Sequence, residues 1–219
     1  FKSTWNGAWQ DSGFFHCAQL DALHKNYHRA LEIIDRSLYR NWHNQKGRHL
    51  KVTLLRKTEQ HDKAQKLIDE SLELDPFNFG VIYEQFLLTN DKQILQELKE
   101  LMRGYVHNHM EFSLDYAEAG FYQEALDFIN LYLDQTDQVY PMAQYFKGYY
   151  TWLMGDEIKA LEYFKMASLL APDYCFPHLI EELLVLKKAT AINPQDAKAW
   201  YYLGNFWYGA RQHKDAIAC

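Results

Sequence analysis

The chain has 219 residues, of which 48% are hydrophobic, and it carries a formal net charge of −6. This apolar fraction supports a sizeable buried core, and the small numbers of glycine and proline, 10 and 5, argue against disorder and against a turn-rich all-β fold. The acidic balance and the lack of a basic run predict no nucleic-acid partner, and the lack of an apolar run of about 18 residues predicts no membrane span.

Apolar residues recur with helical spacing along the chain, in segments separated by short breaks that contain turn residues, such as Asp75-Pro76 and Asn193-Pro194. No segment alternates between apolar and polar residues as a half-buried strand would. The pattern predicts helices over Asp11–His24, Tyr27–Tyr39, Gln45–Thr58, Asp62–Leu74, Phe79–Thr89, Lys92–Arg103, His107–Ala119, Tyr122–Leu133, Pro141–Met154, Glu157–Leu170, Pro177–Ala191, Ala197–Tyr208 and from Lys214 onward.

Several of these helices open with polar residues followed by an alanine. Ala30 and Ala64 lie 34 residues apart, and Ala125 and Ala160 lie 35 residues apart. A small residue at a recurring position lets two helix backbones approach closely, and a period near 34 residues with paired helices indicates a helical-hairpin repeat. The sequence therefore predicts an array of helix pairs.

A longer motif accompanies this period. Trp200, Leu203, Gly204 and Trp207 follow the W-x2-L-G-x2-Y pattern of a first repeat helix. The positions that follow the repeat are Ala30, Ala64, Ala125, Gly148, Ala160, Phe164, Pro172, Trp200, Leu203, Gly204, Trp207 and Ala216. The chain thus resembles the tetratricopeptide repeat (TPR) family over nearly its whole length. This resemblance implies an all-α, TPR-like helical-hairpin solenoid with a right-handed superhelix, which acts as an interaction scaffold.

The array is expected to be irregular in two places. Ala64 and Ala125 lie 61 residues apart, which is too short for two full repeats, and a single extra helix is expected near 177–191. We expect one repeat array over residues 1–219, with units of roughly 11–44, 45–78, 79–105, 106–139 and 141–174, the single helix 177–191 and a truncated unit 197–219. The start at Phe1 and the stop inside a helix predict a fragment of a longer protein. We expect this fragment either to self-associate through its C-terminal end or to fray there.

Three short stretches suggest a narrower likeness: Trp5–Trp9, Pro172–Pro177 and Ala199–Asn205. They are similar to the TPR segment of large bacterial proteins that carry an upstream β-rich domain of unknown function. This resemblance implies the scaffold half of a multidomain protein, whose other domain is similar to carbohydrate-associated folds.

No group of residues predicts catalysis, a metal site or a cofactor. His24 and His28 are four residues apart but flank a turn, and no further ligand completes a metal set. His107 and His109 are interpreted as solvated or capping residues. The cysteines are far apart and are interpreted as small apolar residues: Cys17, Cys175 and Cys219. Phosphate-binding loops and nucleophile elbows are absent from the sequence, so we expect no enzyme activity.

Two first helices carry aromatic residues on a face that the repeat motif does not use. The candidate ligand groove consists of Tyr145, Tyr149, Trp152, Tyr201, Asn205 and Tyr208. Two interpretations are open: the rings pack beneath the helix 177–191, or they form a platform for a peptide or a glycan. Lys198 and Asn205 alone would suit a clamp for a peptide carboxylate, so such a clamp is not expected.

The expected function is therefore a non-catalytic interaction scaffold that contacts a protein or peptide partner, or another domain of the same chain. The alternatives are a glycan- or peptide-binding module, and an accessory domain of a carbohydrate-active multidomain protein. The sequence does not determine where the protein is located.

Overall fold

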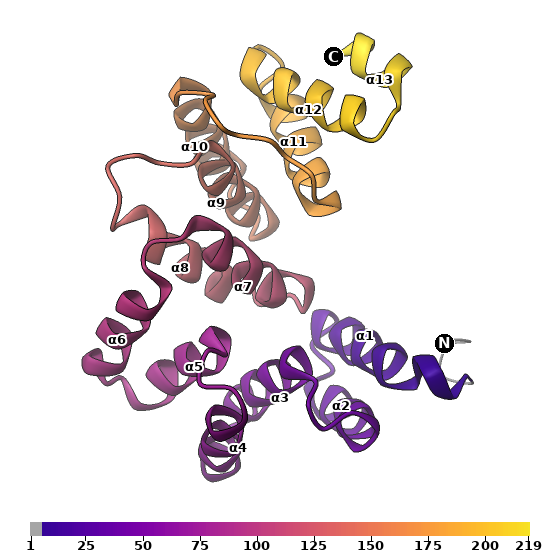
Figure 1. Ribbon diagram of the computed structural model, residues 1–219, viewed down its shortest axis with the longest axis vertical. Helices are drawn as coiled ribbons and strands as arrows, with labels where there is room; N and C mark the ends of the chain where they lie inside the picture. The colour runs from indigo at the N-terminus through magenta and orange to yellow at the C-terminus, as the bar shows by residue number, and fades with distance from the viewer. Residues whose placement is uncertain (1–5) are drawn as a thin grey trace. The chain divides into compact units, whose positions relative to one another are not determined.

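The computed structural model describes residues 6–219, so that Trp5, which begins the first of the three stretches above, lies outside the described residues. Within that range the chain is all-α, and no strand occurs (Figure 1). A short 3-10 helix over Gly7–Trp9 leads into the first α-helix, and the side chain of Asn6 caps it by accepting from the Ala8 amide.

Thirteen α-helices follow one another in the described residues. Their bounds are α1 (Gln10–Leu23), α2 (Tyr27–Arg40), α3 (Gln45–Lys57), α4 (His61–Leu74), α5 (Phe79–Thr89), α6 (Lys92–Met102), α7 (Val106–Glu118), α8 (Tyr122–Leu133), α9 (Pro141–Leu153), α10 (Glu157–Leu169), α11 (Ile180–Ile192), α12 (Ala197–Gly209) and α13 (His213–Ala218). Each predicted helix end lies within one residue of the observed end, except the start of α11.

Helix α11 begins at Ile180 and not at Pro177 because the carboxylate of Glu182 binds the backbone ahead of it. Glu182 Oε2 accepts from the backbone amides of His178 and Leu179 at 2.6 and 2.8 Å. A glutamate at the third helical position that reaches back in this way closes the helix start. The residues before Ile180 are therefore held outside the helix.

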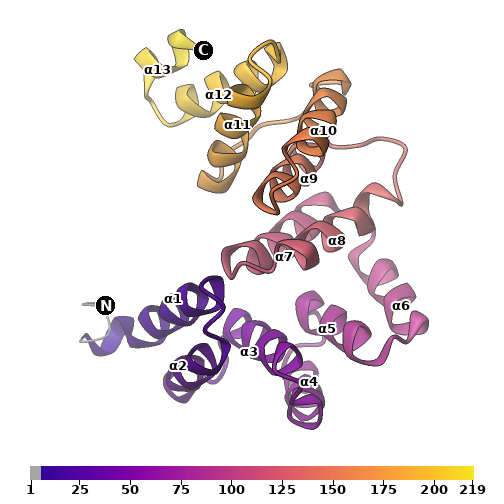
Figure 2. The same ribbon diagram turned by 180° about the vertical axis from the view of Figure 1, so that it is seen from behind.

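The helices gather into two compact units. The first comprises the residues up to Gly104 together with Asp115–Phe121, and the second comprises Tyr105–Leu114 together with Tyr122–Cys219. Within each unit, consecutive helices pack as hairpins: α1 with α2, α3 with α4 and α5 with α6 in the first, and α9 with α10 and α12 with α13 in the second (Figures 1 and 2). This succession of helical hairpins is TPR-like.

Small residues fill the contact between the two helices of a hairpin. Ala30, Ala64, Ala125 and Ala160 are all fully buried. Each lies in the first turn of its helix, and for Ala30, Ala64 and Ala160 this is the second helix of a hairpin, where a larger side chain would force the two helices apart. The alanines that recur with the repeat period in the sequence therefore mark positions where two helices approach each other closely.

A buried charge pair joins α3 to α5 in the first unit. Arg56 donates to Glu84 through Nε at 2.6 Å and through Nη2 at 3.1 Å, and Glu84 is fully buried. The hydroxyl of Tyr116 on α7 donates to the same carboxylate at 2.8 Å. A buried carboxylate needs such partners, because desolvation of the charge would otherwise be costly.

His109 on α7 is fully buried, so the interpretation of it as a solvated or capping residue was wrong. Its Nδ1 lies 3.0 Å from the carbonyl of Tyr105, and its ring lies against Phe128 and Tyr132. The Nε2 atom has no hydrogen-bond partner among the described residues. Burial lowers the pKa of His109, because a charged imidazole would lie among aromatic rings.

His109 should make the fold sensitive to acid. Below a pH of about 6.5 the unfolded chain binds a proton at this residue that the folded chain does not, so stability falls as the pH falls through that value. We expect the free energy of unfolding of the natural chain to decrease more steeply between about pH 7 and pH 5 than that of His109→Phe. Urea unfolding at several pH values measures this, and parallel profiles for the two proteins would contradict it.

Candidate functional site

The aromatic residues of α9 are largely covered by the helices that follow them. Tyr145 is fully buried, and its hydroxyl donates to Asp196 Oδ2 at 2.9 Å. Its ring centroid lies 6.3 Å from that of Phe164 and 6.1 Å from that of Tyr202. Burial raises the pKa of Tyr145, with the neighbouring Asp196 charge as the next cause. Tyr145 therefore belongs to the core of the second unit and has no surface to offer a ligand.

Tyr149 and Trp152 are half-buried at the edge of the same face. Their rings stack with centroids 5.8 Å apart and planes at 25°. Lys188 of α11 covers the Trp152 ring, because its Nζ lies 3.7 Å from the centroid of that ring. The cation over the indole face is a favourable contact that holds α11 against α9.

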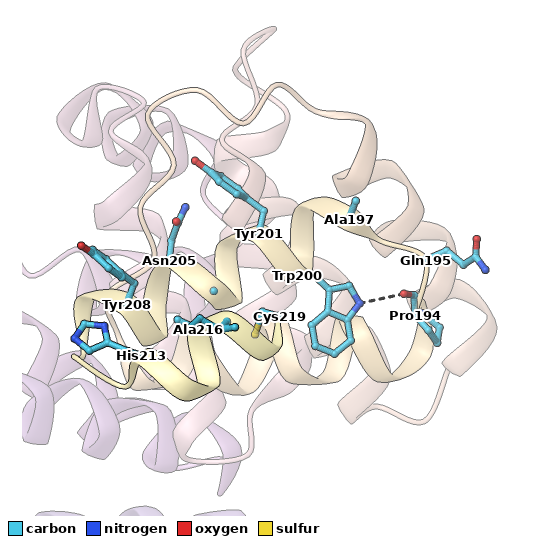
Figure 3. Close-up of a pocket in the computed structure, with 12 residues that line it drawn as sticks. Pro194, Gln195, Ala197, Trp200, Tyr201, Asn205, Tyr208, His213, Ala216 and Cys219 are labelled. Carbon is cyan, nitrogen blue, oxygen red and sulfur yellow. Dashed lines mark hydrogen bonds between the residues drawn. The ribbon is translucent and has the colours of Figure 1, made fainter.

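The aromatic residues of α12 are placed differently. Tyr201 and Tyr208 are 54% and 69% exposed, and Asn205 is half-buried between them on the same side of the helix (Figure 3). They line a groove of about 940 Å³ that α12 forms with α13 and with the turn before α12. The residues that line this α12–α13 groove are Pro194, Gln195, Ala197, Trp200, Tyr201, Gly204, Asn205, Tyr208, His213, Ala216, Ile217 and Cys219.

The α12–α13 groove is neutral and partly apolar. Its lining contains no Asp, Glu, Lys or Arg, although 24% of the whole chain is charged. The Trp200 indole donates to the carbonyl of Pro194 at 3.0 Å, which fixes that ring at one end of the groove (Figure 3). At the other end the Tyr208 ring lies 5.5 Å from the ring of His213. The groove can therefore receive apolar groups with a few uncharged polar partners.

The polar tips of α12 in the groove are available to a ligand. The hydroxyls of Tyr201 and Tyr208 and the side-chain amide of Asn205 have no hydrogen-bond partner among the described residues. Ile217, on α13, is 87% exposed and adds an apolar edge. Sequence spacing alone finds the residues on α12, whereas the contributions of α13 and of Gln195 depend on how the chain turns around them. The pair Asn193-Pro194 predicts that turn, but it does not predict that the turn lines a groove.

A second concavity lies among α2, α3 and α4 in the first unit, with a volume of about 330 Å³. Its three lysines already have partners: Lys51 Nζ lies 2.7 Å from Asp35 Oδ1, Lys66 Nζ lies 3.9 Å from Glu70 Oε1, and Lys63 Nζ donates to Gln60 Oε1 at 2.8 Å. This concavity has less free binding capacity than the α12–α13 groove.

Within residues 6–219, no cluster of three or more His, Cys, Asp or Glu side chains could hold a metal ion. Cys175 is buried, and burial raises the pKa of its thiol to about 11, so it is protonated near neutral pH. In the same range, no helix combines the length and the apolar character that crossing a bilayer requires.

Comparisons with known proteins give structural likeness only. No protein-family model matches the sequence, and no curated protein matches it. Among solved structures, YrrB, described as a TPR protein with an unusual peptide-binding site, is 19% identical over 86% of this chain and 89% of its own, with a TM-score of 0.37. A thermophilic TPR protein of Thermus thermophilus is 16% identical over 83% of this chain and 98% of its own, with a TM-score of 0.38.

A third similar structure is PilW, described as a widely conserved type IV pilus biogenesis factor. It is 16% identical over 95% of this chain and 97% of its own, with a TM-score of 0.39. The helix pairing and the alanine register of the present chain are TPR-like in their own right.

Proposed function

We propose that this chain is a non-catalytic interaction scaffold, and that the α12–α13 groove is where it binds a protein or peptide partner. One observation carries the proposal: the exposed rings of Tyr201 and Tyr208 line one groove together with the Asn205 side chain. The two tyrosine hydroxyls and the Asn205 amide have no hydrogen-bond partner among the described residues. Clustered exposed aromatic residues are unusual on a surface that has no partner. Tyrosine is also enriched among the residues that carry binding energy at protein interfaces.

The chemistry of the groove favours a peptide over a glycan. Ala216 and Ile217 of α13 add apolar side chains to the lining, and an apolar lining suits apolar side chains of a peptide. A glycan needs many hydrogen-bonding groups around each ring, and the groove offers mainly Asn205, Gln195 and the two tyrosine hydroxyls. The partner on this proposal is a separate protein or another domain of the same polypeptide.

Panning a random peptide library over the immobilised chain tests the proposal. Tyr201→Ala/Tyr208→Ala should reduce the binding of selected peptides at least tenfold, because truncated interface tyrosines commonly cost more than 1 kcal/mol each. The matched control is Tyr39→Ala/Tyr174→Ala, which removes the same atoms from residues that are 84% and 88% exposed outside the groove.

The control variant should bind the selected peptides as the natural chain does. Peptides that bind both double variants equally would contradict the proposed site. A glycan array that shows binding dependent on Tyr201 and Tyr208, without any peptide selected, would replace the peptide with a sugar as the ligand.

A further inference from the structure

We propose that Lys147, on α9, is a modification site that accepts an acyl group from activated acyl donors, with acyl phosphates as the preferred class. The site lies within the second unit, and none of its residues lines the α12–α13 groove. It consists of Lys147, of Lys159 and Tyr163 on α10, and of Asp134, which directly follows α8. The inference does not depend on the proposed function.

Two lysines from the α9–α10 hairpin share the ring of Tyr163. The Nζ atom of Lys147 lies 4.8 Å from the centroid of this ring, and the Nζ atom of Lys159 lies 5.9 Å from it. No other aromatic ring among the described residues has two such cations. Neither amine takes part in an ion pair or a side-chain hydrogen bond within residues 6–219. Each ammonium group therefore faces a like charge near the same ring and has no ion pair that offsets it.

The surroundings of Lys147 favour its neutral amine. Its side chain is half-buried, whereas Lys159 and Asp134 are exposed. Burial lowers the pKa of Lys147 below the usual lysine value of about 10.4; the Asp134 charge opposes this shift, and the Lys159 charge adds to it. A larger fraction of Lys147 is therefore unprotonated near neutral pH than is usual for lysine.

The neutral amine is the form of lysine that attacks an acyl carbon. The lone pair of Lys147 Nζ attacks the carbonyl carbon of an acyl phosphate, a C–N bond forms, and the C–O bond to the phosphate breaks. The leaving phosphate keeps the electron pair of that bond and takes up the proton that the amine loses. The products are an amide on Lys147 and hydrogen phosphate.

The charge of Lys159 selects among the donors. An acyl phosphate is anionic, so an exposed ammonium group attracts it to the ring at which Lys147 lies. Because Lys159 has no ion pair among the described residues, its charge is available to the phosphate. An uncharged thioester gains nothing from this attraction. The pair of lysines therefore favours the anionic donor.

Brief treatment of the full chain with acetyl phosphate, followed by site-resolved mass spectrometry, tests the proposal. Acetylation of Lys147 should be about threefold faster than that of Lys165, an exposed lysine of α10, because the gain in neutral amine exceeds the loss of nucleophilicity that accompanies a lower pKa. With S-acetyl-N-acetylcysteamine, an uncharged thioester, this preference for Lys147 should be smaller.

Two charge variants should move the rate at Lys147 in opposite directions. Lys159→Gln should slow its acetylation by acetyl phosphate about threefold, because it raises the pKa of Lys147 and removes the attraction for the phosphate. Asp134→Asn should speed it, because the carboxylate no longer raises that pKa. The matched controls are Lys165→Gln and Asp137→Asn, which make the same charge changes at exposed positions of α10 and of the segment after α8, and they should leave the rate unchanged.

Three results would overturn the proposal. Acetylation of Lys147 that is no faster than that of Lys165 would remove Lys147 as the site. A change in the same direction for Lys159→Gln and Asp134→Asn would show that the rate does not follow the charges around the amine. An equal preference for Lys147 with acetyl phosphate and with the thioester would overturn the assignment of acyl phosphates as the preferred class.

Discussion

Replacing Arg56 with methionine should destabilise the first unit by about 3–5 kcal/mol, the usual cost of removing one partner from a buried ion pair. The substitution keeps most of the aliphatic stem but leaves the Glu84 carboxylate fully buried without its guanidinium partner. The Tyr116 hydroxyl still donates to that carboxylate, yet a single neutral donor does not compensate a buried charge. Urea unfolding followed by far-ultraviolet circular dichroism measures the loss.

Two further variants separate this cause from a general effect of losing a charge. Arg56→Met/Glu84→Gln should recover much of the stability, because the amide removes the buried charge and keeps an oxygen that accepts from the Tyr116 hydroxyl. Lys66→Met breaks the exposed pair with Glu70, in which the lysine side chain is 79% exposed, and should change stability by less than about 1 kcal/mol. A loss below about 1 kcal/mol for Arg56→Met would mean that the pair does not stabilise the unit.

Gly148→Ala should destabilise the second unit by about 1–2 kcal/mol, although alanine normally favours a helix by about 1 kcal/mol over glycine. A Cβ at this position would lie 2.6 Å from the nearest ring atom of Phe164, which is fully buried and cannot move aside without disturbing the core. The cost of overpacking therefore exceeds the gain in helix propensity. Thermal and urea unfolding of the variant measure the difference.

Gly204 is the matched control for this effect, because it occupies the equivalent position one hairpin later. A Cβ there would make only ordinary contacts, 3.4 Å to the Cβ of Cys219 and 3.5 Å to the carbonyl of Ala216. Gly204→Ala should be neutral or stabilise the chain by up to about 1 kcal/mol. Equal destabilisation by the two substitutions would contradict the assignment of Gly148 to a close contact between α9 and α10.

The helices could be predicted from the sequence because their causes are local. Apolar spacing, turn residues and a recurring alanine such as Ala160 act within one or two helices, and the observed helix ends follow them closely. The start of α11 could not be predicted, because it depends on the Glu182 carboxylate, which accepts from the amides of His178 and Leu179. The N-cap residue is Leu179, whereas the usual sequence signal for a helix start is a serine, threonine, aspartate or asparagine at that position.

The candidate site was only partly predictable for a different reason. Spacing places Tyr145 and Trp152 on one face of α9, and Tyr201 and Tyr208 on the equivalent face of α12. Whether a face is covered depends on the segment that packs on it. Helix α11 covers the first face, and within the described residues no segment covers the second. That difference is tertiary, so helical periodicity cannot distinguish the two faces.

Mapping a library-selected peptide onto the chain by backbone amide chemical-shift changes tests most directly the central claim, which is that the α12–α13 groove binds a partner. Saturation with the selected peptide should shift amides of α12, of α13 and of the turn at 194–196, and Tyr201→Ala/Tyr208→Ala should diminish those shifts. Shifts that cluster instead around Trp42 and Lys63, in the concavity among α2, α3 and α4, would contradict it, as would a spectrum that the peptide leaves unchanged.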